Sequence, residues 1–288
     1  MGYTIAQKII KNHLLSGEMT VGSEIGLRID QTLTQDATGT MAYLEFEAMG
    51  VPRVKTEKSV AYIDHNTLQT GFENADDHRY IQTVAAKHGI WFSRPGNGIC
   101  HQVHLERFGV PGQTLIGSDS HTRYGALGTM GVGEGGPEIV KQLLKNTYDI
   151  AAPQVVLVWL TGTPPHGVGP HDVAIALCGA VYGNGFAKNK ILEFAGPGVA
   201  HLPMDYRIGI DVMTTETACL SSIWQTDDAV AEYLTIHGRP EAYTRLAPEE
   251  GACYDAMISI DLSRLEPMAA LPFHPSEAVT LRELLHDP

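Results

Sequence analysis

The chain is short of cysteine, and the few that it has are far apart. Its 288 residues include four cysteines, with no C-x-x-C pair among them. In a chain without an export signal, such cysteines are predicted to be reduced thiols. A zinc or iron–sulfur site built from this chain alone is therefore not expected. The four are Cys100, Cys178, Cys219 and Cys253.

Long apolar segments are also missing. The longest apolar run, residues 155–160, is far short of the roughly 20 residues that a membrane-spanning helix needs. The first residues lack the basic segment followed by an apolar stretch that marks a secretory signal. We therefore predict a cytoplasmic protein that has no membrane partner.

Basic residues are few compared with acidic ones. The chain has 20 lysines and arginines against 33 aspartates and glutamates, which gives a formal net charge of −13. Such a surface repels nucleic acid, so we predict no nucleic-acid partner. It would also repel an anionic substrate, unless basic side chains or helix N-termini gather locally.

What the sequence does contain is a regular alternation of strand-like and helical patterns. This alternation predicts an α/β fold whose first domain is a layered, mostly parallel sheet with helices on both faces. A segment rich in glycine and proline, residues 161–170, leads into a second, smaller α/β domain. We place the boundary near residue 154, so that the predicted domains are 1–154 and 155–288.

The expected elements follow from the spacing of apolar residues and from glycines that end several helices. Helices are expected over residues 4–15, 36–49, 76–88, 100–108, 137–147, 172–181, 215–223 and 227–236. Strands are expected over residues 25–30, 60–63, 114–117, 155–160, 191–194 and 257–262.

Polar side chains gather where two of these strands end. Residues 64–66 follow one strand, residues 118–122 follow another, and polar segments 35–36 and 97–101 lie in neighbouring turns. Because ligands of open α/β sheets bind outside the carboxyl ends of the strands, we expect these segments to share one rim. The titratable side chains brought together in this way are His65, His101, His121, Asp36, Asp64 and Asp119.

Imidazoles paired with carboxylates are suited to moving protons. A neighbouring carboxylate fixes the tautomer of the imidazole and raises its pKa, so that the ring can donate a proton to a leaving hydroxyl. Simpler explanations stay open for each motif alone: Asp36 fits a helix N-cap, residues 64–65 a capped loop, and residues 119–120 an Asx turn. A metal-dependent hydrolase with His65, His101 and His121 as ligands is a further alternative.

Five segments occur in an order and at a spacing that resemble the N-terminal half of the aconitase superfamily of iron–sulfur hydro-lyases. The resemblance covers nearly the whole chain and implies the first two domains of that family. It also implies stereospecific dehydration and hydration of a small hydroxy-di- or tricarboxylate. The segments are Gln35-Asp-Ala-Thr38, Asp64-His-Asn66, Gly98-Ile-Cys-His-Gln102, Gly117-Ser-Asp-Ser-His-Thr122 and Gly196-Pro-Gly-Val199.

The resemblance implies a role for each matching residue. Asp64 and His65 would form a carboxylate–imidazole pair beside the leaving hydroxyl, with His65 as the proton donor. Asp119 would orient His101 or His121. Three further residues are implied at the site: Gln35 and Ser120, which would bind substrate, and Glu216, the acidic residue from the second domain.

Cations for a substrate carboxylate are few in this region. Arg123 directly follows the Ser-His-Thr segment and is the best candidate in the chain for binding a substrate carboxylate. The alternative is that Arg123 is a surface arginine.

The resemblance further implies a [4Fe–4S] cluster whose cysteine ligands lie outside this chain. Family members take these cysteines, and substrate-binding arginines, from later domains. We therefore expect them in missing C-terminal domains or in a partner subunit, and expect the chain to be inactive alone. Tyr124 and Val212 stand where family aconitases have asparagines, and these departures leave open a second function, that of a carboxylate-binding or regulatory relative without a cluster.

Overall fold

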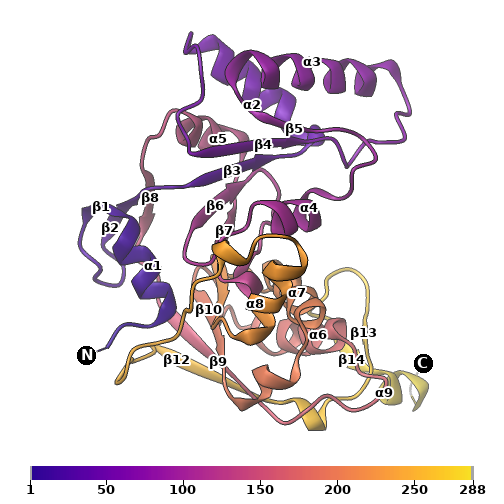
Figure 1. Cartoon of the computed structure of the whole chain (residues 1–288). Coiled ribbons are helices and arrows are strands. Elements are labelled where there is room, and N and C mark those ends of the chain that lie inside the picture. The colour runs from indigo at the N-terminus through magenta and orange to yellow at the C-terminus, as the bar shows by residue number, and fades with distance from the viewer. Residues whose placement is uncertain (1, 287–288) are drawn as a thin grey trace.

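Five short strands from the first half of the chain form an all-parallel sheet in the order β5-β4-β3-β6-β7. Residues 2–286 are described by this computed structural model (Figure 1). The strands are β3 (Gln31–Thr34), β4 (Lys58–Tyr62), β5 (Trp91–Ser93), β6 (Thr114–Gly117) and β7 (Met130–Gly133). From β3 the chain first builds outward through β4 and β5, and then returns to place β6 on the other side of β3.

Helices cover both faces of this sheet (Figure 1). Successive apolar side chains of the strands point to opposite faces of the sheet and pack in two different clusters. Ala61 and Ile116 pack on one face, and Val60 and Leu115 pack on the other. On the first face lie α2 (Asp36–Ala48), α3 (Phe72–His88) and α5 (Gly136–Leu143), and on the second lies α4 (Cys100–Arg107). The expected α/β class with a parallel sheet between helices is confirmed.

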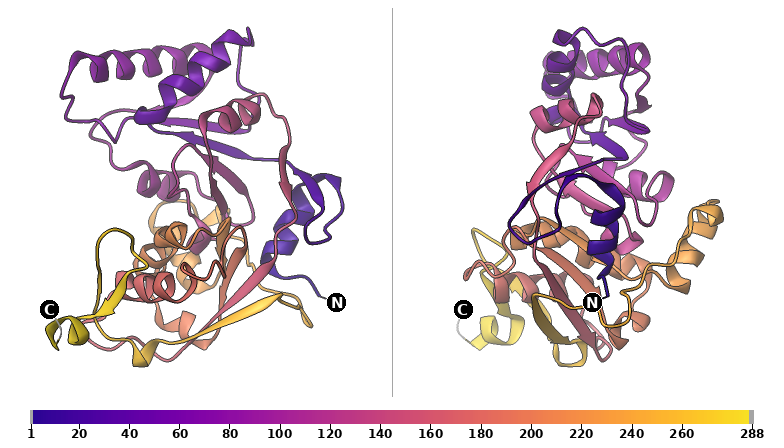
Figure 2. Two further views of the ribbon diagram at one scale, coloured as in Figure 1. Left: turned by 180° about the vertical axis from the view of Figure 1, so that it is seen from behind. Right: turned by 90° about the vertical axis from the view of Figure 1, so that its left-hand side faces the viewer.

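A second parallel sheet occupies the later half of the chain and has the order β11-β10-β9-β12. Figure 2 shows from two further directions that it lies below the first sheet. Its strands are β9 (Val155–Thr161), β10 (Ile191–Ala195), β11 (Ser221–Trp224) and β12 (Ala256–Asp261), and the helices in this part are α6 (Pro170–Val181), α7 (Met204–Val212), α8 (Asp228–Ile236) and α9 (Leu281–His286).

The remaining elements are small. An antiparallel sheet has the order β1-β2-β8, and a two-stranded hairpin lies near the C-terminus. The predicted domain boundary near residue 154 falls in the turn between β8 and β9 and stays a prediction. These elements are α1 (Ile5–His13), β1 (Leu14–Gly17), β2 (Glu24–Leu27), β8 (Tyr148–Ala151), β13 (Met268–Ala270) and β14 (Ala278–Thr280).

Helix α1 is tied to the second sheet by a buried carboxylate. Glu193 of β10 accepts hydrogen bonds from the main-chain N–H groups of Ile5 and Ala6, at 3.1 and 2.9 Å, and from the hydroxyl of Tyr254 at 2.7 Å. The first N–H groups of a helix have no partner within it, so Glu193 satisfies two donors that would otherwise be unpaired. Burial raises the pKa of Glu193 despite these bonds.

Two sequence-based predictions of elements were wrong. The helix expected over 215–223 is instead a 3₁₀ turn, Met213–Thr217, followed by β11. All four β11 residues are buried, so the strand has no polar alternation that would distinguish it from a buried helix. Of the strand expected over 25–30, only residues 25–27 lie in a strand, β2, and β3 begins after this range in a different sheet. Helix α7 was not predicted.

No helix within residues 2–286 is both long and apolar enough to cross a bilayer.

Candidate active site

The predicted polar segments meet at the topological switch point of the first sheet, between β3 and β6. Strands β3 and β6 are neighbours, but the chain leaves them toward opposite edges of the sheet. Their carboxyl ends therefore border the crevice in which open α/β sheets bind ligands. Gln35 follows β3, the 118–122 loop follows β6, Asp64 follows β4, and α4 follows β5.

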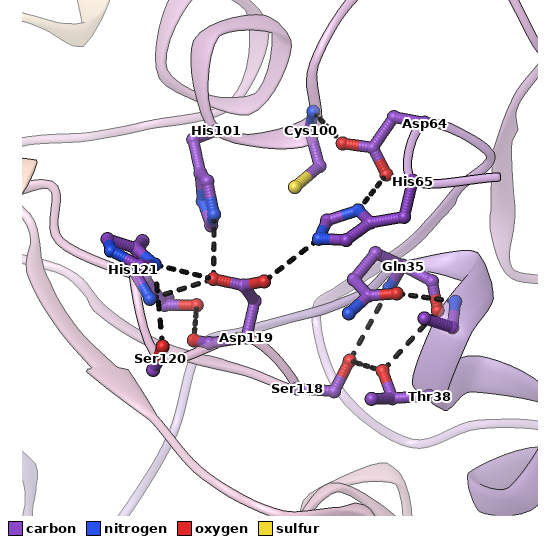
Figure 3. Close-up of polar contacts among 12 residues, drawn as sticks. Gln35, Thr38, Asp64, His65, Cys100, His101, Ser118, Asp119, Ser120 and His121 are labelled. Atoms are coloured by element: carbon purple, nitrogen blue, oxygen red, sulfur yellow. Dashed lines mark hydrogen bonds and ion pairs between the residues drawn. The ribbon is translucent and has the colours of Figure 1, made fainter. Parts of the chain in front are cut away.

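Asp119 lies at the centre of this group (Figure 3). One carboxylate oxygen is 3.0 Å from Nε2 of His101, and the other is 3.2 Å from Nε2 of His65. The first oxygen also accepts the main-chain N–H of His121 at 2.7 Å. Burial opposes ionisation of Asp119, but the hydrogen bonds from His101 and His121 outweigh it and lower the pKa of the carboxyl. Asp119 is therefore an ionised carboxylate in contact with three histidines.

His65 is placed between two carboxylates. Its Nδ1 lies 2.9 Å from Asp64 Oδ1, while its Nε2 faces Asp119. The second oxygen of Asp64 accepts the main-chain N–H of Cys100 at 2.6 Å, at the start of α4. Burial disfavours protonation of His65, but the hydrogen bond and charge of Asp64 and the charge of Asp119 prevail, so the pKa of His65 is raised.

His121 connects the rim to the second half of the chain. Its Nε2 lies 3.2 Å from Oε1 of Glu216, which is in the 3₁₀ turn before β11. The other oxygen of Glu216 is 3.7 Å from Nε2 of His274, in the loop between β13 and β14. The Asp119 carboxylate, 3.6 Å from Nδ1, is the largest cause that raises the pKa of His121, and the charge of Glu216 adds to it against burial.

Asp36 holds the 64–66 loop in place through hydrogen bonds to its main chain. Its side chain is buried, and its oxygens accept the N–H groups of Asp64, His65 and Asn66 at 2.9, 2.8 and 2.8 Å. Burial raises the pKa of Asp36, but these three bonds outweigh it, and the net shift is downward. The N-cap of α2 is Gln35, so the expectation that Asp36 caps this helix is wrong.

Gln35 and Ser120 lie at the rim as expected. The side-chain oxygen of Gln35 accepts the N–H of Ala37, whereas its amide nitrogen has no hydrogen-bond partner among residues 2–286. The hydroxyl of Ser120 is 3.4 Å from Nδ1 of His121. Both side chains have polar atoms that could still bind a ligand, and their predicted substrate-binding roles remain untested.

Two glycines allow the 118–122 loop to pack closely against the strand ends. A Cβ atom at Gly117 would overlap the side chain of Thr122, and one at Gly133 would overlap the main chain of Asp119 and Ser120. The loop therefore needs glycine at both positions in order to present Asp119 at this place.

Arg123 requires a correction. Its side chain is buried rather than on the surface, and the guanidinium donates to the carbonyl oxygens of Thr122 and Cys219 at 3.1 and 3.0 Å. Its Nε is buried and has no hydrogen-bond partner among the residues that the structure describes. Because the guanidinium is held by main-chain carbonyls inside the protein, the structure does not place Arg123 as a clamp for a substrate carboxylate.

Tyr124 was read from the sequence only as a departure from the family pattern. The structure buries it completely and places its hydroxyl 3.1 Å from Nδ1 of His101. The only sequence signal that could have revealed this contact is the proximity of Tyr124 to the 118–122 segment.

The cysteines do not form a ligand set for an iron–sulfur cluster. Cys178 and Cys219 are buried with their thiols near main-chain carbonyls, Cys100 is buried beside the site, and Cys253 is exposed. Burial raises the pKa of Cys100, and raises that of Cys178 to about 12, whereas cluster ligands are thiolates. Within the described part of the chain, the cysteines therefore do not fit such a cluster.

The histidines do not form a three-histidine metal site either. Within residues 2–286, the group whose ligand atoms are close enough for an ion is Asp36, Asp64 and His65. The oxygens of both aspartates already accept main-chain N–H groups, so this group is better explained as loop support.

The rim is open rather than enclosed. The side chains of His65 and His121 are 34% and 38% exposed. The cavities described for residues 2–286 are lined by other residues, for example between α6 and β12. The described residues thus form an open rim and not a closed pocket.

Comparison with known proteins identifies similar sequences over nearly the whole chain. Residues 7–288 match the family model described as "Aconitase family (aconitate hydratase)". The mitochondrial aconitate hydratase of Candida albicans is 33% identical over 304 residues, which cover 98% of this chain and 39% of that protein. The corresponding hydratase of Schizosaccharomyces pombe is 33% identical, with coverages of 96% and 38%.

A second kind of relative is shorter. The 3-isopropylmalate dehydratase large subunit of Elusimicrobium minutum is 31% identical over 287 residues, which cover 99% of this chain and 68% of that subunit. The chain therefore spans about two fifths of the hydratases and about two thirds of the large subunit.

Proposed function

Because the chain belongs to the aconitase family, we propose that it supplies acid–base side chains of a hydro-lyase acting on a small hydroxy-di- or tricarboxylate. The relatives named above are a hydratase of aconitate and a dehydratase of 3-isopropylmalate, which supports this substrate class. The reaction removes water from such an acid and adds it back.

The observation that carries the proposal is the convergence of three carboxylate–imidazole pairs at one rim. Asp64 pairs with His65, Asp119 with His101, and Glu216 with His121. These residues come from loops, from the first turn of α4 and from the 3₁₀ turn before β11, so the meeting of the three pairs is a property of the fold and not of local sequence.

The pairs suggest a division of tasks. A hydroxyl group leaves as water only after it takes up a proton, and a positioned cationic imidazole can supply that proton. His65 has carboxylates at both ring nitrogens and a raised pKa, so it is the proposed donor. Asp119 stays ionised and holds the rings of His65 and His101 in place.

The same histidines offset the charge of the chain. With a net charge of −13, the protein needs local positive groups near an anionic substrate. The pKa values of His65 and His121 are both raised, which favours the cationic form of these two rings. The free amide nitrogen of Gln35 and the hydroxyl of Ser120 are proposed to donate hydrogen bonds to substrate oxygens.

The rest of the catalytic apparatus is proposed to come from outside this chain. The [4Fe–4S] cluster typical of the family has no ligand set among the cysteines described above, so we place its ligands in C-terminal domains or in a partner subunit. The greater length of the relatives supports the first source, and the name "large subunit" supports the second. This chain alone is expected to be inactive.

The test is to combine the chain with its missing half, reconstitute iron and sulfide anaerobically, and measure hydration of unsaturated di- and tricarboxylates. His65→Gln should lower kcat at least about 100-fold, as expected for loss of a general acid. His166→Gln, an exposed histidine of the connector, is the matched control and should not change it.

A loaded cluster without turnover of any of these acids would contradict the proposal. Calorimetric binding of a dicarboxylate under the same conditions would then favour the carboxylate-binding relative. The predicted cytoplasmic location and absence of a nucleic-acid partner belong to the same proposal; the named hydratases are mitochondrial proteins. Retention of RNA at physiological salt would overturn the latter prediction.

A further inference from the structure

His101 and Tyr124 form a contact that the proposed function does not use. The hydroxyl of Tyr124 lies 3.1 Å from Nδ1 of His101, on the side of the ring opposite to Asp119. Tyr124 is fully buried, and its hydroxyl makes no other hydrogen bond with residues 2–286.

The main chain holds Tyr124 in this position. Its carbonyl accepts the N–H groups of Leu127 and Thr129, both at 3.1 Å, and Tyr124 pairs with Thr129 in an isolated bridge. Its ring packs near those of His101 and His104, with centroid distances of 6.1 and 5.5 Å. The hydroxyl is therefore directed at His101 by a packed and hydrogen-bonded environment.

The direction of the hydrogen bond between Tyr124 and His101 determines the tautomer of His101. A buried hydroxyl must donate its proton to an acceptor, and Nδ1 of His101 is the acceptor within reach. A nitrogen that accepts a hydrogen bond carries no proton in the neutral ring. The ring proton is therefore on Nε2, which points at Asp119 Oδ1 at 3.0 Å.

His104, one turn further along α4, has a similar pair of contacts, with a tyrosine hydroxyl at Nδ1 and a side-chain oxygen at Nε2. The hydroxyl of Tyr62 is 3.0 Å from Nδ1 of His104, and Nε2 of His104 is 2.9 Å from the side-chain oxygen of Gln31. The amide nitrogen of Gln31 donates to the carbonyl of Phe108 at 2.9 Å, which fixes the orientation of the amide. The Tyr62–His104 pair has no contact with Asp119, and it therefore offers a matched control.

We propose that Tyr124 is a positioning residue that fixes His101 in its Nε2–H tautomer, so that the ring presents an N–H donor to Asp119 at Nε2 and keeps Nδ1 unprotonated. The tautomer itself follows from the contacts of this chain, whereas its importance for turnover rests on the proposed function. Tyr124, which stands where family aconitases have an asparagine, thereby makes a polar contact with a residue of the site.

The test is long-range ¹H–¹⁵N correlation NMR on the full chain with ¹⁵N-labelled histidine, above the ordinary imidazole pKa of about 6.5. His101→Gln identifies the signals of His101 by their loss. In the unmodified chain, Nδ1 of His101 should give the signal of an unprotonated nitrogen and Nε2 that of a protonated one. Tyr124→Phe removes only the hydroxyl, so that Nδ1 loses the donor that keeps it unprotonated, and the Nδ1–H tautomer should become detectable although Asp119 still favours Nε2–H.

Tyr62→Phe should leave the His101 signals unchanged and alter those of His104. A protonated Nδ1 in the unmodified chain would overturn the proposal, and this measurement needs no variant. The proposal would also be overturned if Tyr124→Phe folded, as judged by circular dichroism, but showed no Nδ1–H tautomer of His101. Neither readout depends on activity, so the inference and the proposed function can fail separately.

Discussion

His121 Nε2 lies 3.2 Å from Oε1 of Glu216, although the two residues are 95 positions apart in the chain. One belongs to the loop after the first sheet's β6, and the other to the turn that enters the second sheet at β11. This contact gives the rim an acidic group from the second half of the chain, and it makes the protonation of His121 sensitive to how the two sheets are held together.

The first prediction concerns the titration of this histidine. Glu216→Gln should lower the pKa of His121 toward the ordinary value of about 6.5, because one of the charges that raise it is lost. Asp119→Asn should lower it further, since the carboxylate of Asp119 is the larger cause. NMR titration of labelled histidine measures both, and Glu57→Gln, at an exposed glutamate, is the control.

The same shift affects stability, with a definite sign. The folded state holds the proton of His121 more tightly than the unfolded chain, so its stabilising contribution is complete below about pH 6.5 and is lost as pH rises through the folded pKa. Urea unfolding across this range should show a smaller decline for Glu216→Gln than for the unmodified chain. An equal decline in both would show that Glu216 does not contribute.

The second prediction concerns the support of the 64–66 loop. Asp36→Asn places an NH₂ group among three main-chain donors, and should cost about 1–3 kcal/mol of unfolding free energy. Hydrogen exchange at the amides of residues 64–66 should become faster. Asp76→Asn, at an exposed aspartate of α3, should do neither, and unchanged exchange in Asp36→Asn would contradict the assigned role.

Much of this site could be predicted from the sequence, because it depends on where strands end. Periodicity placed residues 64–66 and 118–122 after two strands, and the topology of parallel sheets then implied a shared rim. The role of Asp36 could not be predicted in this way, since its partners are main-chain N–H groups 28 to 30 positions away. The Tyr124–His101 contact likewise depends on the packing of α4 against the 118–124 segment.

The fold shows the same limit. Strand β11 was predicted as part of a helix because all of its residues are buried, and a buried run lacks the alternation that identifies a strand. Arg123 was assigned to substrate or to the surface because arginine is seldom buried. Its carbonyl partners, including that of Cys219, belong to a distant part of the chain and are not apparent from spacing.

The third prediction follows from the burial of Arg123. Arg123→Ala should lower the unfolding free energy by about 1–3 kcal/mol, because two buried carbonyl oxygens lose their donors. Calorimetry with a saturated tricarboxylate should show no change in affinity. Arg107→Ala, at an exposed arginine of α4, should change neither quantity, whereas weaker binding by Arg123→Ala would restore the role of a substrate clamp.

The fourth prediction concerns the carboxylate at the start of α1. Glu193→Ala leaves two helix N–H groups and the hydroxyl of Tyr254 without their acceptor, and should cost about 2–4 kcal/mol. Tyr254→Phe removes only one of these donors and should cost about 1 kcal/mol. Urea unfolding measures both, and equal losses in the two variants would show that the helix donors contribute nothing.

The contact between Ile5 and Glu193 spans 188 positions, and this span has a consequence for synthesis on the ribosome. At about 5–20 residues per second, α1 is synthesised roughly 10 to 40 seconds before its acceptor. A nine-residue helix is marginal in water by itself. The first helix of the nascent chain is therefore expected to be among the last to reach its native place.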